Sequence, residues 1–539
     1  LNLYGIVSMV GASEASHSEG TDQEHLPGQR WIEVQLVGES YGSTGFQRGV
    51  SLFPTLDDEV HVVTEDDLAV IYGSSGPSML RIGTLAASES LPATLDLDKL
   101  VTRHAAIVGS TGSGKSNTVA GFLKSLTDGS FSSARIAVID PHGEYAAALQ
   151  GRARVFSIGS TTLPLIVPYW ALSFDELAWF LVDRRSGTET AQDLTLRDYN
   201  LDQKRSHVAN LQAGVVDAND ITADSPVPFS LQELWYYFDR KERVTYLDSA
   251  RTQEALIAEG SAATLTPARF QPHSTTNTAP YKPSVSPIMG SYVTKILARL
   301  KDRRFSFLLN PGDYNGSVKD LHDLIKDWLD HEHSITVFDL GGVPFEIIDL
   351  VVGVMTRIMF EAMFWGRDLP GIGRQRPLLI VYEEAHGYLP KGGTGPFIAG
   401  YAGRAARRIF KEGRKYGVGA VIVSQRPSDL DETVLSQCGT FISLRLSNSD
   451  DQSRIKATVP DSLAGLMDML PALRTGEALI LGEAVQIPSR VRLPLIEPRP
   501  TSNDPEPAAR WKENRISNPS YAAAVTAWRT QRTPTPNQQ

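Results

Sequence analysis

The clearest pattern of hydrophobic and polar positions lies between residues 104 and 126. The apolar run His104–Val108 predicts a buried strand, and the glycine-rich stretch Gly109–Ser116 predicts a tight turn. After the turn, apolar residues recur at the spacing of one helical face: Val119, Phe122, Leu123 and Leu126. Strand, glycine-rich turn and helix in this order provide the context that a phosphate-binding loop requires.

The turn itself, G-S-T-G-S-G-K-S, matches the pattern G-x-x-x-x-G-K-[ST] at every fixed position. Glycines let the backbone fold around a phosphate, so that successive N–H groups and the helix N-terminus point at it. We expect Lys115 to reach the terminal phosphates of a nucleoside triphosphate and the Ser116 hydroxyl to ligate Mg²⁺. The predicted nucleotide-binding residues here are Gly109, Ser110, Thr111, Gly112, Ser113, Gly114, Lys115, Ser116 and Asn117.

Hydrophobic periodicity divides the 539 residues into five parts. Short alternating strands with turns between them predict a small β-barrel at residues 1–92. Apolar strands and helices predict an α/β core in two parts, residues 93–163 and 331–497, the second of which ends in a β-hairpin. Residues 164–330 are mostly helical in period and predict an insertion of helices. Residues 498–539 are rich in Pro, Asn, Ser and Thr and predict a flexible tail.

Four finer expectations concern single segments of these parts. In the barrel, the alternating residues Glu59–Val63 predict a strand, and the polar stretch Ala12–Gln29 predicts a mobile hairpin tip. In the insertion, residues 258–290 are rich in Ser, Thr, Pro and Ala and predict a flexible excursion. Near the end of the core, Asp461–Leu470 predicts a capped helix.

Two further strands of the core end in acidic residues. Arg135–Asp140 is followed by Pro-His-Gly-Glu-Tyr, which makes Asp140 and Glu144 candidates for orienting water or Mg²⁺ at the nucleotide, although an ordinary strand-end turn explains them equally well. The apolar run that begins at Leu378 ends in Glu383 and Glu384. Downstream of a complete phosphate loop, such a pair predicts a metal-shell acid, Glu383, and a base that polarises the attacking water, Glu384.

A basic helical stretch follows the second acidic strand: Arg404, Arg407, Arg408, Lys411, Arg414 and Lys415. A solvated helix face is the ordinary meaning of such a run. Contact with DNA phosphates, or an arginine supplied to the site of a neighbouring subunit, are the two functional alternatives. The next buried strand ends at Gln425, whose amide can sense the γ-phosphate, and a later strand ends at Arg445.

Composition narrows the class of protein. With a net charge of −10, the chain has no global basic field to attract nucleic acid, so any DNA contact must be local. No apolar run approaches membrane-spanning length, and Phe345–Trp365 is interrupted by charges and predicts an amphipathic helix. The single cysteine, Cys438, excludes an intrachain disulfide and suits a reducing, cytoplasmic location with no membrane contact.

Six motifs taken together resemble a known family. In chain order they are G-S-T-G-S-G-K-S, D-P-H-G-E-Y, V-Y-E-E-A-H, E-G-R-K-Y-G-V-G, V-S-Q-R-P-S and L-S-Q-C-G-T. The set is similar to that of the HerA group of hexameric DNA translocases, in the HerA–FtsK branch of RecA-like P-loop ATPases. The resemblance covers nearly the whole chain. It implies an α/β, RecA-like ATPase core with a HAS-barrel-like N-terminal domain, and ATP and Mg²⁺ as cofactors. It also implies a homo-hexamer that threads DNA, expected to be duplex, through a central pore.

The resemblance also implies roles for single residues. It implies Lys115 and Ser116 on phosphate and magnesium, Glu383 as the metal-shell acid, Glu384 as catalytic base and Gln425 as sensor. Arg414 best matches the arginine given to the next subunit, with Arg407, Arg408 and Arg445 as rivals. An aspartate is commoner than Glu383 at its position, and the change lengthens the ligand without altering its charge. Members work with a partner nuclease, or with a sirtuin-like or nuclease effector in antiphage defence.

The resulting hypothesis is a ring-forming, ATP-dependent DNA translocase or helicase that acts with an effector enzyme. A scaffold whose ATP site controls assembly and activates an effector is the alternative from another class. A ring ATPase that moves protein or conjugative DNA at a membrane is less well supported, because no membrane segment is visible. A small-molecule kinase is the weakest alternative, because the basic helix and the C-terminal hairpin would have no role in it.

Overall fold

The computed structural model describes most of the chain. The described residues are 1–12, 30–42, 45–73, 76–128, 131–184, 189–211, 216–276, 278–282, 287–392, 400–458, 461–501, 507–512 and 521–530. The predicted hairpin tip at Ala12–Gln29, apart from Ala12 itself, and much of the predicted tail lie outside them.

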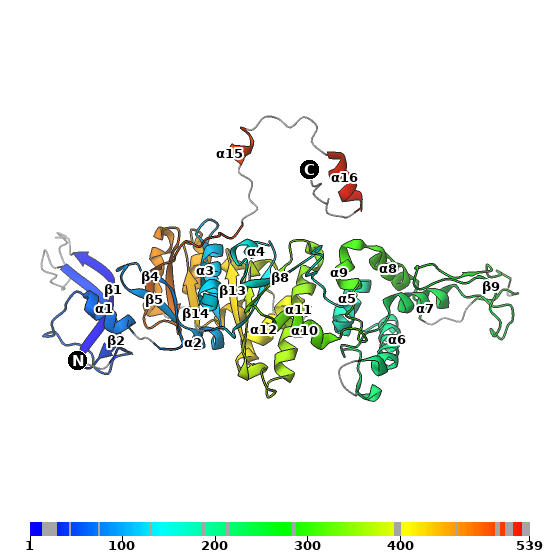
Figure 1. Cartoon of the computed structure of the whole chain (residues 1–539), viewed down its shortest axis with the longest axis horizontal. Helices are drawn as coiled ribbons and strands as arrows, with labels where there is room; N and C mark the ends of the chain where they lie inside the picture. Colours follow the sequence, from blue (N-terminus) through cyan, green and yellow to red (C-terminus); the bar gives the residue numbers. More distant parts are fainter. Residues whose placement is uncertain are drawn as a thin grey trace, which may run out of the picture.

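An eleven-stranded sheet forms the centre of the molecule, in the order β5-β4-β16-β15-β14-β6-β13-β12-β7-β11-β8 (Figure 1). The strands from β14 to β8 are parallel, and those from β15 to β5 are antiparallel. The parallel strands are β6 (Ala105–Val108), β7 (Arg135–Asp140), β8 (Ala153–Ser157), β11 (Ile335–Asp339), β12 (Leu378–Tyr382), β13 (Val418–Ser424) and β14 (Thr440–Ser443). The antiparallel strands are β4 (Met79–Leu85), β5 (Pro92–Asp96), β15 (Glu477–Gly482) and β16 (Ser489–Arg492).

Alternation along the buried strands explains how the sheet is covered on both faces. In β6, Ala105 and Ile107 pack into the core beside α3 (Lys115–Asp128), whereas Ala106 and Val108 pack into the core beside α11 (Ile348–Trp365). A sheet buried on both faces needs strands that are apolar throughout, which is why these strands appear as continuous hydrophobic runs in the sequence. Helices α10 (Leu321–Leu329) and α12 (Tyr401–Glu412) lie on the α11 face (Figure 1).

The predicted α/β class with a RecA-like P-loop core is confirmed. Parallel strands alternate with helices, and one strand, β13, lies between the strand before the glycine-rich turn and the strand before the acid pair. The predicted amphipathic helix at Phe345–Trp365 corresponds to a short 3₁₀ turn and α11. The predicted hairpin at Ala478–Ile487 corresponds to β15 paired with β16. Asp461–Leu470 is helical as expected, but as the 3₁₀ helix Asp461–Ala472.

The N-terminal region differs from the predicted barrel. Strands β1 (Asn2–Ala12), β2 (Arg30–Ser40) and β3 (Gln47–Arg48) form a separate antiparallel sheet, followed by helix α1 (Glu65–Tyr72). Strands β4 and β5 instead join the main sheet, so the described residues before 92 do not close into one barrel. Glu59–Val63 is not a strand, because its exposed valines have no partner strand to pair with among the described residues.

The insertion is helical, with one ordered β arm. Its helices are α5 (Phe174–Val182), α6 (Ala191–His207), α7 (Leu231–Arg243), α8 (Gly290–Lys301) and α9 (Ser306–Leu309). Strands β9 (Leu256–Ala258) and β10 (Arg269–Phe270) pair in an arm that projects from the end of the molecule (Figure 1). The predicted flexible excursion at 258–290 therefore begins as a defined two-stranded structure. Ion pairs from Arg240 to Glu254 and Glu259 fix the base of this arm to α7, which the Ser- and Thr-rich composition does not reveal.

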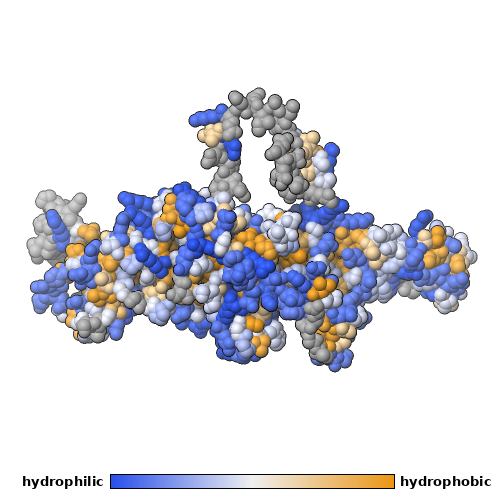
Figure 2. All heavy atoms as spheres, viewed as in Figure 1, coloured by the Kyte–Doolittle hydropathy of each residue, from blue (hydrophilic) through white to orange (hydrophobic). Residues whose placement is uncertain are grey.

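The remaining helices are α2 (Leu97–Thr102), α4 (Tyr145–Ala148), α13 (Glu432–Ser436), α14 (Ser449–Lys456), α15 (Pro507–Arg510) and α16 (Tyr521–Thr530). Figure 2 shows hydrophobic surface at the N-terminal end of the molecule. Phe53, Leu56 and Val62 are exposed residues of the N-terminal region. Within the described part of the chain, none of the helices combines the length and apolar character that a membrane span requires.

Candidate active site at the carboxyl edge of the sheet

The carboxyl ends of β6, β7, β12 and β13 bring the predicted site residues together. These strands are parallel neighbours, so the turns that follow them meet at one edge, where ligands of open α/β sheets bind. The Gly109 amide donates to the Ser424 carbonyl at 3.3 Å, and the Glu383 amide donates to the Ile139 carbonyl at 3.1 Å. Backbone bonds thus fix the phosphate-type turn beside β13 and the acid pair beside β7.

The glycine-rich turn has the backbone shape that its sequence predicts. Gly112 and Gly114 have φ angles of +74° and +99°, a backbone conformation that residues other than glycine rarely adopt. The Ser110 amide donates to the Arg445 carbonyl at 2.9 Å, and the Ser113 carbonyl accepts from Gly476 at 3.2 Å. The turn is therefore held from outside by the segment after β14 and the turn before β15, and it leads directly into the amide-rich N-terminus of α3.

Lys115 meets the second acid of the pair. Its ammonium lies 2.6 Å from Glu384 Oε1 and 4.0 Å from Glu383 Oε1. The Gln425 amide, at the end of β13, donates to the same Glu384 oxygen at 2.9 Å, and Gln425 accepts from the Thr111 hydroxyl at 2.5 Å. Lys115 and Gln425, from two separate turns, thus meet the carboxylate of a third turn, and the residues expected to act as phosphate-binding lysine, base and sensor lie together.

Glu384 combines an unusual backbone with a strongly polar environment. Its φ of +46° is a left-handed conformation, which costs free energy in a non-glycine residue and is found most often at functional sites. Burial alone would raise the pKa of Glu384, but the His386 imidazole, 3.2 Å from Oε2, and the Lys115 ammonium outweigh burial, so the pKa lies below its usual value. Glu384 is therefore anionic at neutral pH, as a general base must be.

Glu383 is more deeply buried than Glu384 and differently bonded. Only 1% of its surface is exposed, and burial raises its pKa to about 8. Its Oε2 accepts a hydrogen bond of 2.7 Å from the Tyr145 hydroxyl, whereas Oε1 has no hydrogen-bond partner among the described residues. A buried carboxylate oxygen without a hydrogen-bond partner fits a hard divalent cation, whose charge would favour the ionised form of this acid. Ser116 and Glu383 are the residues that would hold Mg²⁺.

The turn after β7 contains one candidate that faces the site and one that does not. Glu144 Oε2 accepts from the Ser116 hydroxyl at 2.7 Å. Asp140 is fully buried, and its carboxylate accepts from the amides of Gly143 at 2.9 Å and Tyr145 at 3.1 Å. Although burial raises the pKa of Asp140 to about 6, both oxygens are occupied by the turn's own backbone. These contacts agree with the alternative of a strand-end turn, and a role of Asp140 in orienting water or Mg²⁺ stays a prediction.

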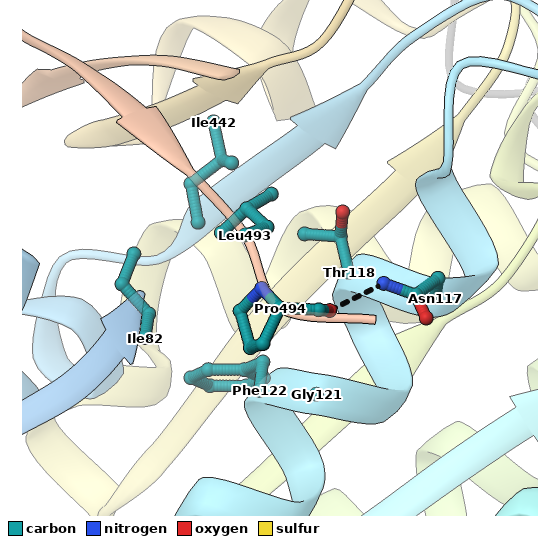
Figure 3. Close-up of a pocket in the computed structure, with 8 residues that line it drawn as sticks. All are labelled: Ile82, Asn117, Thr118, Gly121, Phe122, Ile442, Leu493 and Pro494. Carbon is teal, nitrogen blue, oxygen red and sulfur yellow. Dashed lines mark hydrogen bonds between the residues drawn. The ribbon is translucent and has the colours of Figure 1, made fainter. Parts of the chain in front are cut away.

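The side chain of Asn117 is bonded away from the glycine-rich turn, so its predicted contact with the nucleotide stays a prediction that would involve the backbone. Figure 3 shows its side chain turned toward the segment that follows β16, where its amide donates to the Pro494 carbonyl at 2.9 Å. Its side-chain oxygen accepts from the Ile496 amide at 2.9 Å. Both polar atoms of Asn117 are thus bonded to this segment, on the outer side of α3, and the side chain does not reach the turn that precedes the helix.

The basic residues after the acid pair divide into two groups. Arg407 forms an ion pair with Asp431, and Arg408 pairs with Glu361 and lies over the Phe360 ring, so both hold α12 in place. Arg414 lies in the 3₁₀ turn Gly413–Tyr416, which precedes β13, whereas Gln425 follows β13. The two residues are therefore at opposite ends of this strand. It is exposed and forms no ion pair within the described residues. Arg445 contacts the glycine-rich turn through its backbone carbonyl.

Two residues of the site were not singled out from the sequence. Tyr145 bonds Glu383, and His386 lies beside Glu384. Both belong to motifs noted for other residues, D-P-H-G-E-Y and V-Y-E-E-A-H. His386 follows Glu384 by two residues in one turn, so their contact is local, whereas the parallel pairing of β7 with β12 brings Tyr145 to Glu383.

Comparison with known proteins gives matches along most of the chain. The family model described as "Helicase HerA, central domain" matches residues 80–359, and "Helicase HerA-like C-terminal" matches residues 369–519. The DNA double-strand break repair helicase HerA of Sulfolobus acidocaldarius is 26% identical over 464 residues, which cover 85% of this chain and 77% of that protein. The protein of the same name from Pyrococcus furiosus is 26% identical over 487 residues, covering 86% and 80%. A solved structure of the plasmid coupling protein TrwB with an ATP analogue aligns with a TM-score of 0.47 at 14% identity, covering 85% of this chain and 98% of that one.

Proposed function

The chain belongs to the HerA helicase family, and from this premise we propose that it is an ATP-driven DNA translocase that works as a ring and hydrolyses ATP between subunits. It is a P-loop ATPase of the DNA helicase and translocase class. The geometry that carries the proposal is the convergence of Lys115, Gln425 and Glu384 at the edge of the sheet.

Each of these side chains has a role that its contacts support. Lys115 binds the terminal phosphates, exchanging its carboxylate partner for phosphate oxygens. Glu384, kept anionic by its neighbours, takes a proton from the attacking water, and Gln425 orients the groups at the γ-phosphate. Ser116 and Glu383 are the residues that would hold magnesium, which would supply positive charge to the phosphate oxygens.

Arg414 is the residue proposed to complete the site of the next subunit. It lies one strand length, about 20 Å, from Gln425 in its own chain, because β13 separates the two at about 3.3 Å per residue. An exposed arginine at the opposite edge cannot reach the chain's own site, but it is available to a neighbour packed head to tail. Arg407 and Arg408 are already paired within the chain and are weaker candidates.

The proposal extends to DNA and an effector. We expect duplex DNA in a central pore of a homo-hexamer, gripped by groups at the carboxyl edge such as Lys391. A nuclease or sirtuin-like enzyme is the expected partner, in DNA end processing or antiphage defence. The family membership and the placement of Lys391 just after the acid pair support this part of the proposal.

Mixing two inactive variants tests the shared site. Lys115→Ala disables phosphate binding, and Arg414→Ala removes only the residue offered to the neighbour, so each homogeneous preparation is expected to lose at least 10-fold of its ATPase activity. A mixed ring contains interfaces with an intact Lys115 from one chain and an intact Arg414 from the other, and activity should reappear. Arg407→Ala is the control, because its pairing with Asp431 lies within one chain. Full activity of Arg414→Ala alone would contradict the role of Arg414, and two inactive variants that show no recovery on mixing would contradict hydrolysis between subunits.

A further inference from the structure

The turn after β7 places two consecutive side chains against two different groups of the candidate metal site. Glu144 accepts a hydrogen bond from the Ser116 hydroxyl, and Tyr145 donates one to Glu383, each at 2.7 Å. Ser116 and Glu383 come from separate parts of the chain, and no contact between them is needed for the turn to reach both. One short turn therefore contacts both residues that would hold magnesium.

The position of Tyr145 within this turn is fixed from two directions. Its side chain is fully buried in the core on the α3 face of the sheet. Its backbone amide donates to Asp140 Oδ2 at 3.1 Å, and Asp140 binds the preceding amides of the same turn. The carboxylate of Asp140 thus shapes the turn, and the turn delivers the phenol hydroxyl to a defined place. This accounts for the buried carboxylate of Asp140.

The backbone of Glu383 is equally constrained, but its side chain needs a further restraint. Its amide donates to Ile139 at 3.1 Å, and its carbonyl accepts from the Tyr388 hydroxyl at 2.6 Å. A glutamate has one more rotatable bond than the aspartate commoner at this position, so its carboxylate can turn in more ways. The bond from Tyr145 occupies Oε2 and leaves Oε1 directed toward Lys115, 4.0 Å from the ammonium.

We propose that Tyr145 is a positioning residue for magnesium: its hydroxyl holds the Glu383 carboxylate so that Oε1 is presented to the metal. Partners that orient a metal ligand fix its geometry, and losing one commonly costs 10- to 100-fold in metal affinity. This inference rests on the proposed magnesium-dependent hydrolysis. It explains how a longer acid can serve where the shorter one is usual.

A matched pair of tyrosines makes the test specific. Tyr145→Phe removes the bond to the Glu383 side chain, whereas Tyr388→Phe removes the bond to the Glu383 backbone carbonyl. Both tyrosines are buried, and each variant loses one hydroxyl next to the same residue. We would measure Mn²⁺ affinity of the ADP-bound protein by electron paramagnetic resonance, and ADP affinity separately in EDTA. The expected result is an affinity for Mn²⁺ about 10-fold weaker in Tyr145→Phe, close to wild type in Tyr388→Phe, with metal-free ADP affinity unchanged in both.

A double-mutant cycle with Glu383→Asp gives a second readout. The shorter carboxylate cannot reach the Tyr145 hydroxyl, so Tyr145→Phe should change Mn²⁺ affinity much less in this background than in the wild type. Equal Mn²⁺ affinity of wild type and Tyr145→Phe, an equal loss in Tyr388→Phe, or the same loss in both backgrounds would each overturn the positioning role. A wild-type protein that binds ADP without any Mn²⁺ affinity would instead refute the proposed magnesium site itself.

Discussion

At the level of single residues, Glu384 shows how contacts can decide chemistry. Two adjacent glutamates end the same strand, yet burial raises the pKa of Glu383 to about 8 while His386 and Lys115 keep the pKa of Glu384 low. Environments that separate the pKa values of two neighbouring acids are typical of sites in which the acids have different tasks. In this site the buried acid suits the metal, and the anionic one suits proton transfer.

Glu384→Gln should therefore separate binding from hydrolysis. We expect the ATPase rate to fall by about 10²- to 10⁴-fold, because the amide cannot accept a proton from water. ATP affinity should be retained, since Lys115 loses only a competing carboxylate. Steady-state hydrolysis and binding of a fluorescent ATP analogue measure the two effects, with Glu412→Gln at the exposed end of α12 as control. Residual activity near wild type would show that another group is the base, and a variant that still assembles and activates an effector would favour the scaffold alternative.

His104 makes a pH-dependent contribution to stability. Its ring is 4% exposed, lies 4.7 Å from the Phe410 ring and accepts from the Ala420 amide at 3.1 Å through Nδ1. Burial, and the charge of Arg414 nearby, lower its pKa from 6.5 to about 4. The folded protein therefore keeps His104 neutral where the unfolded chain protonates it. The associated stability is present above pH 6.5 and is lost as the pH falls toward 4, up to about 3 kcal/mol.

Replacing this residue should flatten the pH dependence. His104 has a φ of +55°, so His104→Asn is the suitable variant, because asparagine tolerates the left-handed conformation. Between pH 7.5 and 5 we expect the melting temperature of the wild type to fall further than that of the variant. All other titrating groups are common to both proteins, so the difference isolates His104. Parallel curves would mean that His104 is charged in the folded state or titrates normally.

At the level of elements, the segment after β16 acts as a C-terminal strap, residues 493–501, along the outer side of α3. It bonds Asn117 through Pro494 and Ile496, accepts from Lys124 at 2.8 Å through the Glu497 carbonyl, and donates from Thr501 to the Glu144 carbonyl at 3.0 Å. The strap thus connects the helix that begins at Lys115 with the turn that bonds Ser116. Helix α3 and the turn after β7 are therefore both held by this strap.

Asn117→Ala should loosen the strap without impairing nucleotide binding. The change removes two hydrogen bonds, worth about 1–2 kcal/mol of local stability. We expect hydrogen exchange in residues 494–501 to become about 10-fold faster, because local opening costs less free energy. Thr127→Ala is the control, since that side chain bonds only its own helix and Arg152. A large loss of ATP affinity in Asn117→Ala would instead indicate that its side chain binds the nucleotide directly.

The elements differ in how far the sequence predicts them. The buried strands β6, β7, β12 and β13 are short apolar runs flanked by glycine or acid, so both their type and the edge that carries the site follow from the pattern. Contacts that depend on strand order, such as Tyr145 to Glu383, cannot be derived locally, because no sequence spacing relates positions 238 residues apart. The unpaired segment Glu59–Val63 shows the converse: alternation alone does not supply a partner strand.

At the scale of the whole molecule, charge and hydrophobic surface are unevenly distributed. The chain is acidic overall, while the side chains of Phe53 and Val62 at its N-terminal end are 80% and 92% exposed. Large apolar side chains exposed to this extent are common in surfaces that become buried on association. A ring of identical chains would bury such a surface in every copy and would also repeat each loop of the carboxyl edge around one axis. Local basic groups can then form a positive channel in an acidic protein.

Lys391 is the described residue best placed to test this channel. It is exposed, and its amide donates to the Asp429 carbonyl at 2.6 Å, which fixes the start of the loop beside the site. Lys391→Glu reverses one charge in every subunit, so we expect stimulation of ATP hydrolysis by duplex DNA to disappear while the basal rate stays near wild type. The loss of DNA affinity should be larger at low salt, because phosphate contacts release counterions.

Charge reversal at the other edge of the sheet provides the comparison. Lys415 is also exposed, but it lies before β13, away from the carboxyl edge. Lys415→Glu changes the net charge by the same amount, so it should leave DNA stimulation largely intact if the effect of Lys391 depends on position rather than on total charge. An equal loss in both variants would point to a general electrostatic attraction of DNA. Full stimulation in Lys391→Glu would place the DNA-gripping groups elsewhere on the ring and remove this loop from the proposed pore.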